Sequence, residues 1–314
     1  MIDILGNIRT LAERMGETAA NASFPERIAV APGAATDAAA FAEEAGYRRL
    51  LLVADANTFE AAGRRLRQGA EARRLEVETT LVKPNAQGDV VADEASVVQT
   101  LLDLQRSQAQ AVLAVGAGTL HDVARYAAFT FGVPFISVPT APSVDGFASK
   151  GAPLLVRGEK ITVPAVGPVA VFADTDLLAR APRPLVAAGF GDMLGKTTSL
   201  FDWKFGAATA GEPYSPLVAA ITERALRACV ERAADIGAGK DEGIAALTGA
   251  LIESGLAMLI LGQSHPASGA EHHLSHYWEM EFIRAGRRQL LHGAKVGVAS
   301  ALVSELYRRI AAEG

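Results

Sequence analysis

Histidines gather in one short stretch of the chain, Ser268–Glu279. Three of the six histidines lie there: His272, His273 and His276. If the stretch is helical, a spacing of four places His272 and His276 on one face, a turn apart. Imidazole binds divalent metals and titrates near neutral pH, so one histidine could be a metal ligand and the other a proton-transfer group. A stabilising histidine pair in a half-buried helix is the alternative interpretation.

Two further residues would complete a metal-binding set. Asp192 follows the glycine turn Gly189-Phe-Gly191, and we expect it to begin a helix, where an aspartate could equally serve as a cap. His292 is the remaining candidate, directly before Gly293. One aspartate and two histidines from three segments suit Zn²⁺ or a similar ion with an open position for substrate.

The composition is that of a globular protein without a nucleic-acid partner. The chain has 314 residues, enough for two domains, and is 50% hydrophobic with a formal net charge of −5 and no basic run. A single cysteine, Cys229, excludes an intrachain disulfide and fits a reducing compartment. The N-terminus lacks the pattern of a signal peptide, and we expect no stretch of membrane-span length. These features predict a soluble, cytoplasmic protein.

Short apolar runs alternate with helical segments in the first half of the chain. This alternation predicts a parallel sheet covered on both faces, with ligands at the carboxyl ends of its strands. A hairpin and a last strand are expected between Leu154 and Ala173. The other strands are expected at 27–31, 49–54, 75–82, 111–115 and 134–138, and the helices at 36–45, 58–72 and 93–108.

Beyond Arg183 the sequence predicts only helices, at Ser215–Ile236, Gly243–Leu261 and Lys295–Ala311. The fold class is therefore α/β, with an N-terminal Rossmann-like parallel-sheet domain followed by an all-helical domain. We place the first domain at residues 1–180 and the second at 181–314.

Two loops could bind a nucleotide. Val115–Asp122 leaves a buried strand and leads into a helix expected to begin near Val123. Its glycines would let the backbone approach a pyrophosphate, although a glycine turn there can also be purely steric. The second loop, Val138–Gly146, is rich in hydroxyl groups and has one acid. Loops at neighbouring strand ends would form a cleft.

Five stretches together resemble the sn-glycerol-1-phosphate dehydrogenase family, including its AraM-like bacterial members. That family lies within the superfamily of glycerol dehydrogenase, iron-containing alcohol dehydrogenases and dehydroquinate synthase, so the resemblance implies a dehydroquinate synthase-like fold. The matching stretches are Gly116–Asp122, Ser137–Ser149, Ala187–Phe205, Ser268–Glu279 and Leu291–Gly297.

The resemblance implies a role for each matching residue. Asp192, His272 and His292 would hold the metal, and Asp145 and His276 would face the substrate with Asp192 close to it. Asp55 would meet the adenosine ribose, which would favour NAD over NADP. The other residues implied to contact the cofactor are Gly116, Gly118, Thr119, Leu120, His121, Asp122, Thr140, Ala141, Pro142, Ser143 and Ser149.

The implied activity is metal-dependent hydride transfer between NAD(P)H and dihydroxyacetone phosphate, giving sn-glycerol 1-phosphate. Its cofactors would be NAD or NADP and one divalent metal, Zn²⁺ or else Ni²⁺ or Fe²⁺. Lys150, Lys196, Lys204 and Lys295 are candidates for the substrate phosphate, although a lysine in a helix is more often a solvated surface charge. The relatives suggest a homodimer.

Three other activities remain open: a glycerol or polyol dehydrogenase, a dehydroquinate synthase-like cyclase, and an NAD-binding relative without catalysis. The chain ends soon after His292, so we expect a helical domain shorter than is usual in the family.

Overall fold

The computed structural model describes residues 2–17 and 24–313, and the chain divides into two compact units. The first unit contains Phe24–Pro142 and Gly146–Ala181. The second contains helix α1 (Ile4–Met15), Ser143–Asp145 and the chain from Pro182 onward. The units therefore differ from the predicted ranges 1–180 and 181–314 at α1 and at Ser143–Asp145. Residues 1, 18–23 and 314, which those ranges include, lie outside the described residues.

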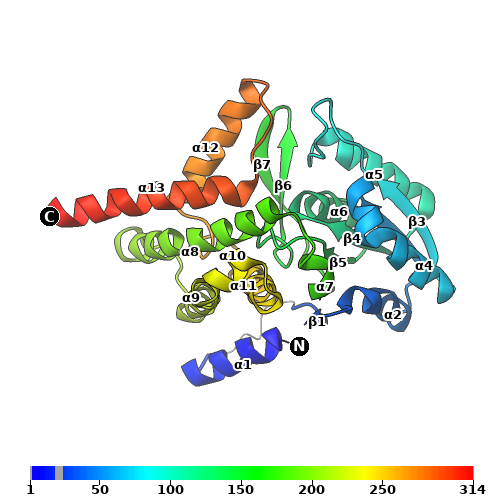
Figure 1. The fold of residues 1–314 in the computed structure, drawn as a ribbon, viewed down its shortest axis with the longest axis horizontal. Helices are drawn as coiled ribbons and strands as arrows, with labels where there is room; N and C mark the ends of the chain where they lie inside the picture. Colours follow the sequence, from blue (N-terminus) through cyan, green and yellow to red (C-terminus); the bar gives the residue numbers. More distant parts are fainter. Residues whose placement is uncertain (1, 18–23, 314) are drawn as a thin grey trace. The chain divides into compact units, whose positions relative to one another are not determined.

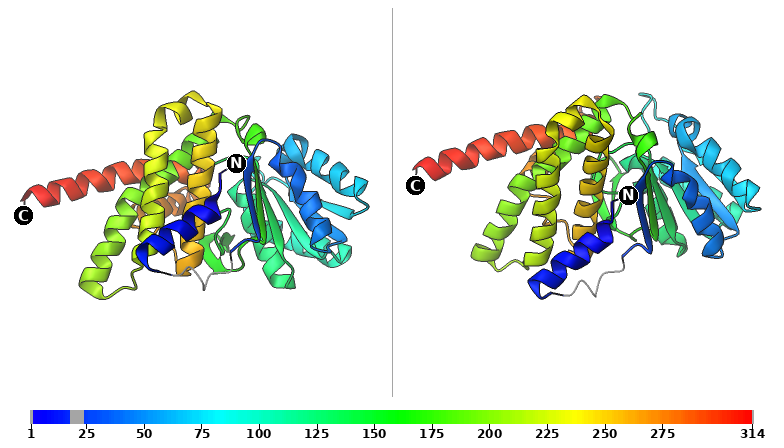
Figure 2. Two further views of the ribbon diagram at one scale, coloured as in Figure 1. Left: turned by 90° about the horizontal axis from the view of Figure 1, so that it is seen from below. Right: turned by 60° about the horizontal axis from the view of Figure 1, so that its bottom comes forward.

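Helix α1 belongs to the helical unit because its apolar face packs there. Ile4, Ile8 and Ala12 are four residues apart, so they share one face of the helix, and all three are buried. This helix lies against α9 (Pro216–Glu231), as Figure 2 shows. Arg224 of α9 also donates a hydrogen bond to the backbone oxygen of Asn7, at 3.0 Å. The sequence analysis missed this helix.

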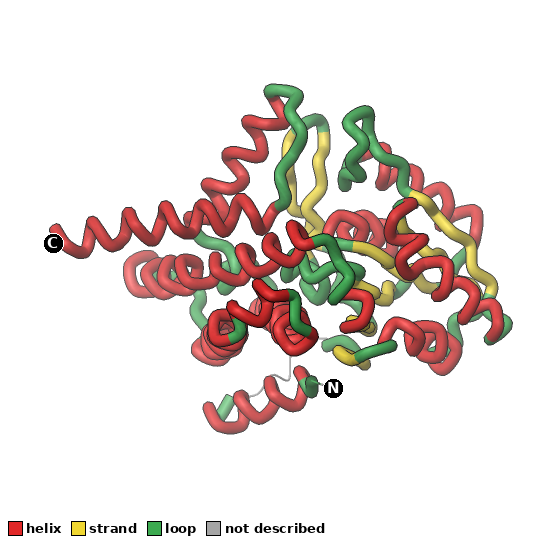
Figure 3. Tube along the Cα trace, viewed as in Figure 1, coloured by secondary structure: helices red, strands yellow, loops and turns green. Residues whose placement is uncertain are grey.

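A parallel sheet forms the centre of the first unit, as predicted. Its six strands run in the order β1-β8-β5-β4-β2-β3, and neighbouring strands are parallel. Figure 3 shows the strands in yellow and the helices in red. A separate antiparallel hairpin, also predicted, turns at Arg157 and Gly158, which both have positive φ. The strands are β1 (Arg27–Ala31), β2 (Arg49–Ala54), β3 (Glu76–Leu81), β4 (Ala111–Gly116), β5 (Phe135–Pro139), β6 (Gly151–Val156), β7 (Glu159–Pro164) and β8 (Ala170–Asp174).

Helices cover both faces of this sheet. Leu50 and Leu52 of β2 belong to a core cluster that contains residues of α2 and α4, whereas Leu51 and Val53 belong to a cluster with residues of α5 and α6. Successive side chains of a strand point to opposite faces, so β2 is apolar and buried from Leu50 to Ala54. The helical segments of this unit are η1 (Ala34–Thr36), α2 (Asp37–Glu44), α3 (Ala56–Thr58), η2 (Phe59–Gly63), α4 (Arg64–Ala72), α5 (Glu94–Ser107), α6 (Gly118–Phe131) and α7 (Thr175–Leu178).

The second unit is helical, as predicted, but two of its helices differ from expectation. The single helix expected at 215–236 is interrupted at Arg232 and forms α9 and α10. Asp192, expected at a helix start, lies in the interior of the 28-residue helix α8. Besides α1 and α9, the helices of this unit are α8 (Arg183–Ala210), α10 (Ala233–Ala238), α11 (Asp241–Leu261), α12 (Ala270–Arg284) and α13 (His292–Glu313).

Helix α11 corrects the expectation that no stretch reaches membrane-span length. Within residues 2–17 and 24–313 it is the one helix long and apolar enough to cross a bilayer by length and composition. Because 67% of its apolar window is buried inside the structure, its hydrophobicity is explained by its place in the core of the helical unit.

Glycines bring α8 and α13 into backbone contact (Figure 1). A Cβ atom on Gly191 would overlap the backbone oxygen of Gly293, and one on Gly293 would overlap the oxygen of Ala188. One turn further along α13, a Cβ on Gly297 would lie 3.0 Å from the Cα of Gly191. The glycines that suggested a turn in the sequence therefore permit this close helix crossing, which places Asp192 next to the start of α13.

Replacing Gly191 with alanine tests the crossing. We expect the Gly191→Ala variant to lose about 1–3 kcal/mol of unfolding free energy, because a methyl group there forces the two backbones apart. Gly237→Ala in α10 is the matched control, since a Cβ at that position meets nothing within 4 Å. Urea unfolding measures both variants, and equal stabilities would contradict the packing account.

Candidate functional site

The three residues expected to hold a metal meet in the helical unit. Asp192 comes from α8, His272 from α12, and His292 is the first residue of α13. Their potential ligand atoms all lie within 4.8 Å of one another. The Nε2 atom of His272 is 3.8 Å from Oδ1 of Asp192, and the two histidine rings are 5.1 Å apart between centroids. Three helices thus bring together one carboxylate and two imidazoles.

His276 lies beside this group, on the same face of α12 as His272. Its ring centroid is 6.1 Å from that of His272 and 5.9 Å from that of His292. The predicted one-turn spacing is confirmed, because both histidines lie within a continuous helix. His273, between them, is exposed on another face. His276 is half-buried, so its imidazole can exchange protons while remaining close to the ligand set.

A buried lysine joins the two aspartates of the site. The Nζ atom of Lys196 lies 2.8 Å from Oδ2 of Asp145 and 2.9 Å from Oδ1 of Asp192, and it donates to the oxygen of Ala267 at 3.2 Å. The backbone N–H of Asp145 donates to Oδ2 of Asp192 at 3.0 Å, and Ser254 donates to Asp145 at 2.9 Å. Lys196, considered above for the substrate phosphate, is fully buried and engaged by these carboxylates.

The charges of this cluster depend on one another. Burial raises the pKa of Asp192, and the nearby charge of Asp145 raises it further, whereas Lys196 and His272 lower it. Burial would lower the pKa of Lys196, but the two carboxylates outweigh that effect and raise it. Lys196 therefore remains an ammonium ion and favours the ionised form of Asp192, although burial and Asp145 keep the pKa of Asp192 raised overall. A cation bound beside Asp192 would favour its ionised form further.

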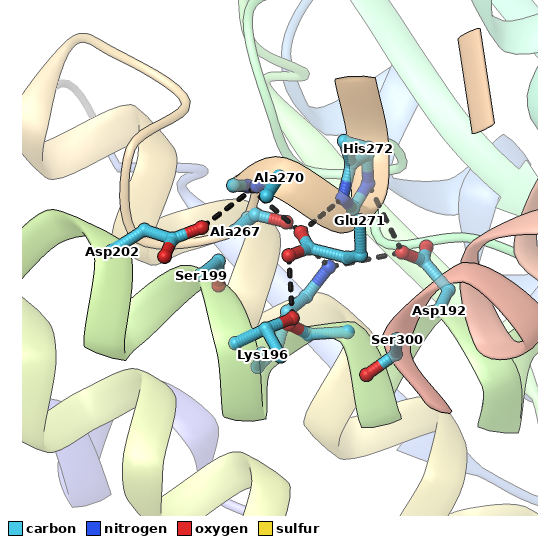
Figure 4. A network of polar contacts seen from close by, with 12 residues as sticks. Asp192, Lys196, Ser199, Asp202, Ala267, Ala270, Glu271, His272 and Ser300 are labelled. Carbon is cyan, nitrogen blue, oxygen red and sulfur yellow. Dashed lines mark hydrogen bonds and ion pairs between the residues drawn. The ribbon is translucent and has the colours of Figure 1, made fainter. Parts of the chain in front are cut away.

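Glu271 supports His272 from within the interior (Figure 4). Its Oε1 lies 2.7 Å from Nδ1 of His272 and accepts from the N–H of Gly269 at 2.8 Å, while its Oε2 accepts from Thr198 at 2.5 Å. Burial alone would raise the pKa of Glu271, but these partners and the charge of His272 lower it to about 2. The sequence analysis missed this residue; its one signal was an acid directly before a candidate ligand.

Asp202 also supports the start of helix α12. It accepts a hydrogen bond from the backbone N–H of Ala270 at 2.7 Å and another from the hydroxyl of Tyr307 at 2.5 Å. The beginning of α12, which carries Glu271 and His272, is thereby tied to both α8 and α13.

The residues expected to bind a cofactor lie mainly in the first unit, at the carboxyl ends of adjacent strands. Asp55 follows β2, Ala117 follows β4 and Thr140 follows β5. The order in which the chain adds strands to the sheet reverses between β2 and β4. Open α/β sheets bind ligands at such a point. Thr140 donates its N–H to the oxygen of Gly116 at 3.0 Å, so two of the loops are joined. The loop continues through Ala141 and Pro142; Ser149 also belongs to this unit, but Ser143 belongs to the helical unit.

Helix α6 begins at Gly118 and not near Val123 as expected. Gly118, Thr119 and Leu120 are therefore its first turn, whose backbone N–H groups suit an anion. Its N-cap residue is Ala117, and among the described residues no side-chain hydrogen bond caps the start of the helix. Asp55, by contrast, uses Oδ1 to accept from the N–H of Thr58 at 2.8 Å, so it also caps α3.

His121 and Leu120 point into the protein core. The ring of His121 is fully buried, with Nδ1 3.0 Å from the oxygen of Ala117 and Nε2 2.7 Å from the hydroxyl of Ser137. Burial lowers the pKa of His121 to about 3, so the ring is neutral. Leu120 occupies the space where a side chain on Gly116 would lie. Both residues therefore offer a cofactor only their backbone.

Buried Arg125 organises the two remaining residues of this set. It pairs with Asp122 at 3.1 Å and donates to the backbone oxygens of Gly146 and Gly151. The hydroxyl of Ser149 donates to the same oxygen of Gly146 at 3.3 Å. Burial raises the pKa of Asp122 to about 7, although Arg125 opposes this. The sequence analysis gave no role to Arg125, whose function is to hold the segment between β5 and β6.

Comparison with known proteins gives concordant matches. The sequence model of the iron-containing alcohol dehydrogenase family matches residues 29–182. Glycerol-1-phosphate dehydrogenase (NAD(P)+) of Geobacillus thermodenitrificans is 51% identical over 285 residues, which are 91% of this chain and 70% of that protein. The enzyme of the same name from Geobacillus stearothermophilus is 48% identical over 311 residues, 99% of this chain and 77% of that protein.

A solved structure shows the same fold. Glycerol dehydrogenase from Schizosaccharomyces pombe superposes with a TM-score of 0.74 at 19% identity, covering 91% of this chain and 72% of that chain. At this identity the likeness concerns the fold alone, and it agrees with a parallel sheet followed by helices.

Removing the buried ammonium tests the charge balance of the site. We expect Lys196→Met to lower the unfolding free energy by about 3–5 kcal/mol, because two carboxylates then remain buried without their partner. Lys204→Met is the matched control, since Lys204 is an exposed residue of the same helix. Chemical unfolding of the metal-free proteins measures the difference, and a Lys196→Met variant as stable as the control would refute the role assigned to the ammonium.

The neutral state of His121 predicts a pH dependence of stability. The folded pKa is about 3 and the ordinary value is 6.5, so the unfolded chain takes up the proton first as the pH falls. The contribution of His121 to the unfolding free energy is complete above pH 6.5 and is lost as the pH falls towards 3, by about 5 kcal/mol in total.

His121→Gln removes this titrating group, whereas His273→Gln removes an exposed one. The stability of the His121→Gln variant relative to wild type should therefore improve as the pH falls from 6.5 to 3. Urea unfolding at several pH values measures this, and parallel curves for His121→Gln and wild type would contradict the prediction.

Proposed function

The chain belongs to the glycerol-1-phosphate dehydrogenase family, and from this premise we propose that it interconverts dihydroxyacetone phosphate and sn-glycerol 1-phosphate with NAD(P)H. The observation that carries the proposal is the meeting of Asp192, His272 and His292 beside His276. Reduction of a carbonyl group needs an electrophile at the oxygen and a source of a proton. The aspartate and two histidines could hold an electrophilic metal, and His276 could donate the proton.

We propose Asp192, His272 and His292 as the ligands of one divalent metal. The donor set fits such an ion, because three protein ligands of these types leave an open coordination position. When bound, the metal would supply Lewis-acid stabilisation of the charge on the substrate oxygen. Zn²⁺ suits the set, and Ni²⁺ or Fe²⁺ are compatible with it.

His276 and Asp145 are the residues that we assign to the substrate. The half-buried imidazole of His276 would deliver the proton to the developing alkoxide, directly or through water. Asp145 is held by Lys196 and Ser254, so it has a fixed position from which to orient the substrate hydroxyl groups. Lys196 contacts both aspartates and lowers the pKa of Asp192 relative to what burial alone would give.

The cofactor would bind at the carboxyl ends of β2, β4 and β5, with its pyrophosphate at the start of α6. The cofactor would supply the hydride, and the protein would hold the cofactor in position. Asp55 favours NAD through its place at the end of β2. We also propose a homodimer and a cytoplasmic location.

The test is oxidation of NADH and of NADPH with dihydroxyacetone phosphate, on protein stripped of metal and reloaded separately with Zn²⁺, Ni²⁺ or Fe²⁺. We expect turnover only after reloading, and a preference for sn-glycerol 1-phosphate over glycerol in the reverse direction. Faster oxidation of glycerol would instead assign a polyol substrate, and binding of NAD without turnover under any ion would contradict the proposed activity.

Replacing His272, and separately its neighbour His273, tests whether His272 is a metal ligand. We expect His272→Asn to lower kcat/KM for dihydroxyacetone phosphate on the order of 100-fold, because one of three ligands is lost. His273→Asn changes the neighbouring, exposed histidine and should leave kcat/KM unchanged. Equal effects of the two substitutions would rule out the assigned ligand set.

A further inference from the structure

Glu271 lies in the interior of the helical unit, without access to water. It is fully buried, and both of its oxygens have partners within the helical unit. Gly195 of α8 makes room for it, because a Cβ there would lie 3.4 Å from Cγ of Glu271 and 3.6 Å from Cε1 of His272. A buried carboxylate is costly, so its presence next to a candidate ligand calls for a function.

The contact with His272 determines which ring nitrogen carries the proton. Oε1 of Glu271 already accepts from the backbone N–H of Gly269, so it presents an acceptor to Nδ1 of His272 across the 2.7 Å contact, and Nδ1 is the donor. In the neutral ring the lone pair is then on Nε2. That nitrogen faces Oδ1 of Asp192 at 3.8 Å, which is too long for a hydrogen bond and is compatible with two ligands of one ion at about 2.0–2.2 Å each.

The partners of Glu271 fix its own orientation. The Gly269 N–H binds the oxygen that contacts His272, and Thr198 of α8 binds the other oxygen. The carboxylate is thereby held from two sides, by the segment before α12 and by the helix that carries Asp192. A shift of Glu271 would therefore move His272 relative to Asp192.

We infer that Glu271 is a positioning residue: its carboxylate holds His272 with the proton on Nδ1 and with Nε2 directed towards Asp192, which strengthens this imidazole as a metal ligand. The inference rests on the proposed metal site and goes beyond it by assigning the residue that prepares one ligand. Carboxylates that accept from a ligating histidine typically contribute about 10–100-fold to metal affinity.

The experiment measures Co²⁺ binding to the metal-free protein in competition with a chelator, so that it does not depend on turnover. Glu271→Gln preserves the size of the side chain but removes its charge, and we expect it to weaken Co²⁺ binding about 10–100-fold. Glu281→Gln is the matched control, because Glu281 is an exposed residue of the same helix that pairs with Arg284. Its Co²⁺ affinity should equal that of wild type.

A spectroscopic readout distinguishes positioning from a general structural effect. Long-range ¹⁵N–¹H correlation spectra of histidine-labelled, metal-free protein should show His272 with its proton on Nδ1 in wild type and in Glu281→Gln. In Glu271→Gln the Nε2-protonated form should appear, because the amide can donate to Nδ1. An unchanged His272 tautomer together with unchanged Co²⁺ affinity would overturn the inference.

Thr198→Val provides a second route if Glu271→Gln fails to fold. It leaves the carboxylate in place but removes the hydroxyl that holds Oε2. We expect weaker Co²⁺ binding than in wild type, restored by Thr198→Ser, and unchanged binding in Thr198→Val would overturn the inference. If wild type itself binds no Co²⁺, the proposed function fails; if wild type binds Co²⁺ and the Glu271 and Thr198 variants bind it equally well, the inference alone fails.

Discussion

The ion pair between Lys196 and the carboxylates of Asp145 and Asp192 is the interaction on which the site depends. A carboxylate can serve as a metal ligand only when it is ionised, yet burial in the helical unit favours its neutral form. Lys196, one turn from Asp192 on α8, offsets this cost and is itself kept charged by the two carboxylates. A divalent cation bound beside Asp192 would favour its ionised form further, and we therefore propose that this cluster is a preorganised metal site.

Backbone packing supplies the geometry that the charges require. The ligands come from three helices, and their meeting depends on the glycine contact between α8 and α13, which no larger residue allows. The start of α12 is then held by Asp202 and by Glu271, so His272 has little freedom to turn. The first unit offers strand ends and the first turn of α6, where we propose that backbone N–H groups meet the pyrophosphate of a cofactor. Side-chain chemistry is thus concentrated in one unit and cofactor binding is assigned to the other.

The sequence predicted what depends on local pattern. Buried parallel strands are largely apolar, so β2, β4 and β5 were recognisable, and the residue types of Asp192, His272 and His292 indicated a metal. Features that depend on distant contacts were missed or wrong. The glycines of α8 suggested a turn because their packing partner lies about a hundred residues away on α13. Lys196 was considered for a phosphate because its two carboxylate partners could not be seen, and α1 was placed in the wrong domain because its apolar face has no local partner.

The central claim is that one divalent ion is bound jointly by Asp192, His272 and His292. The most direct measurement is the anomalous scattering of a crystal of the cobalt-loaded protein, combined with X-ray absorption spectroscopy at the cobalt edge. Our account predicts one anomalous peak among these three side chains and an absorption spectrum with two imidazole ligands, with Nε2 of His272 facing the metal. A principal peak elsewhere, or a metal bound through Nδ1 of His272, would contradict both the ligand set and the role of the carboxylates that support it.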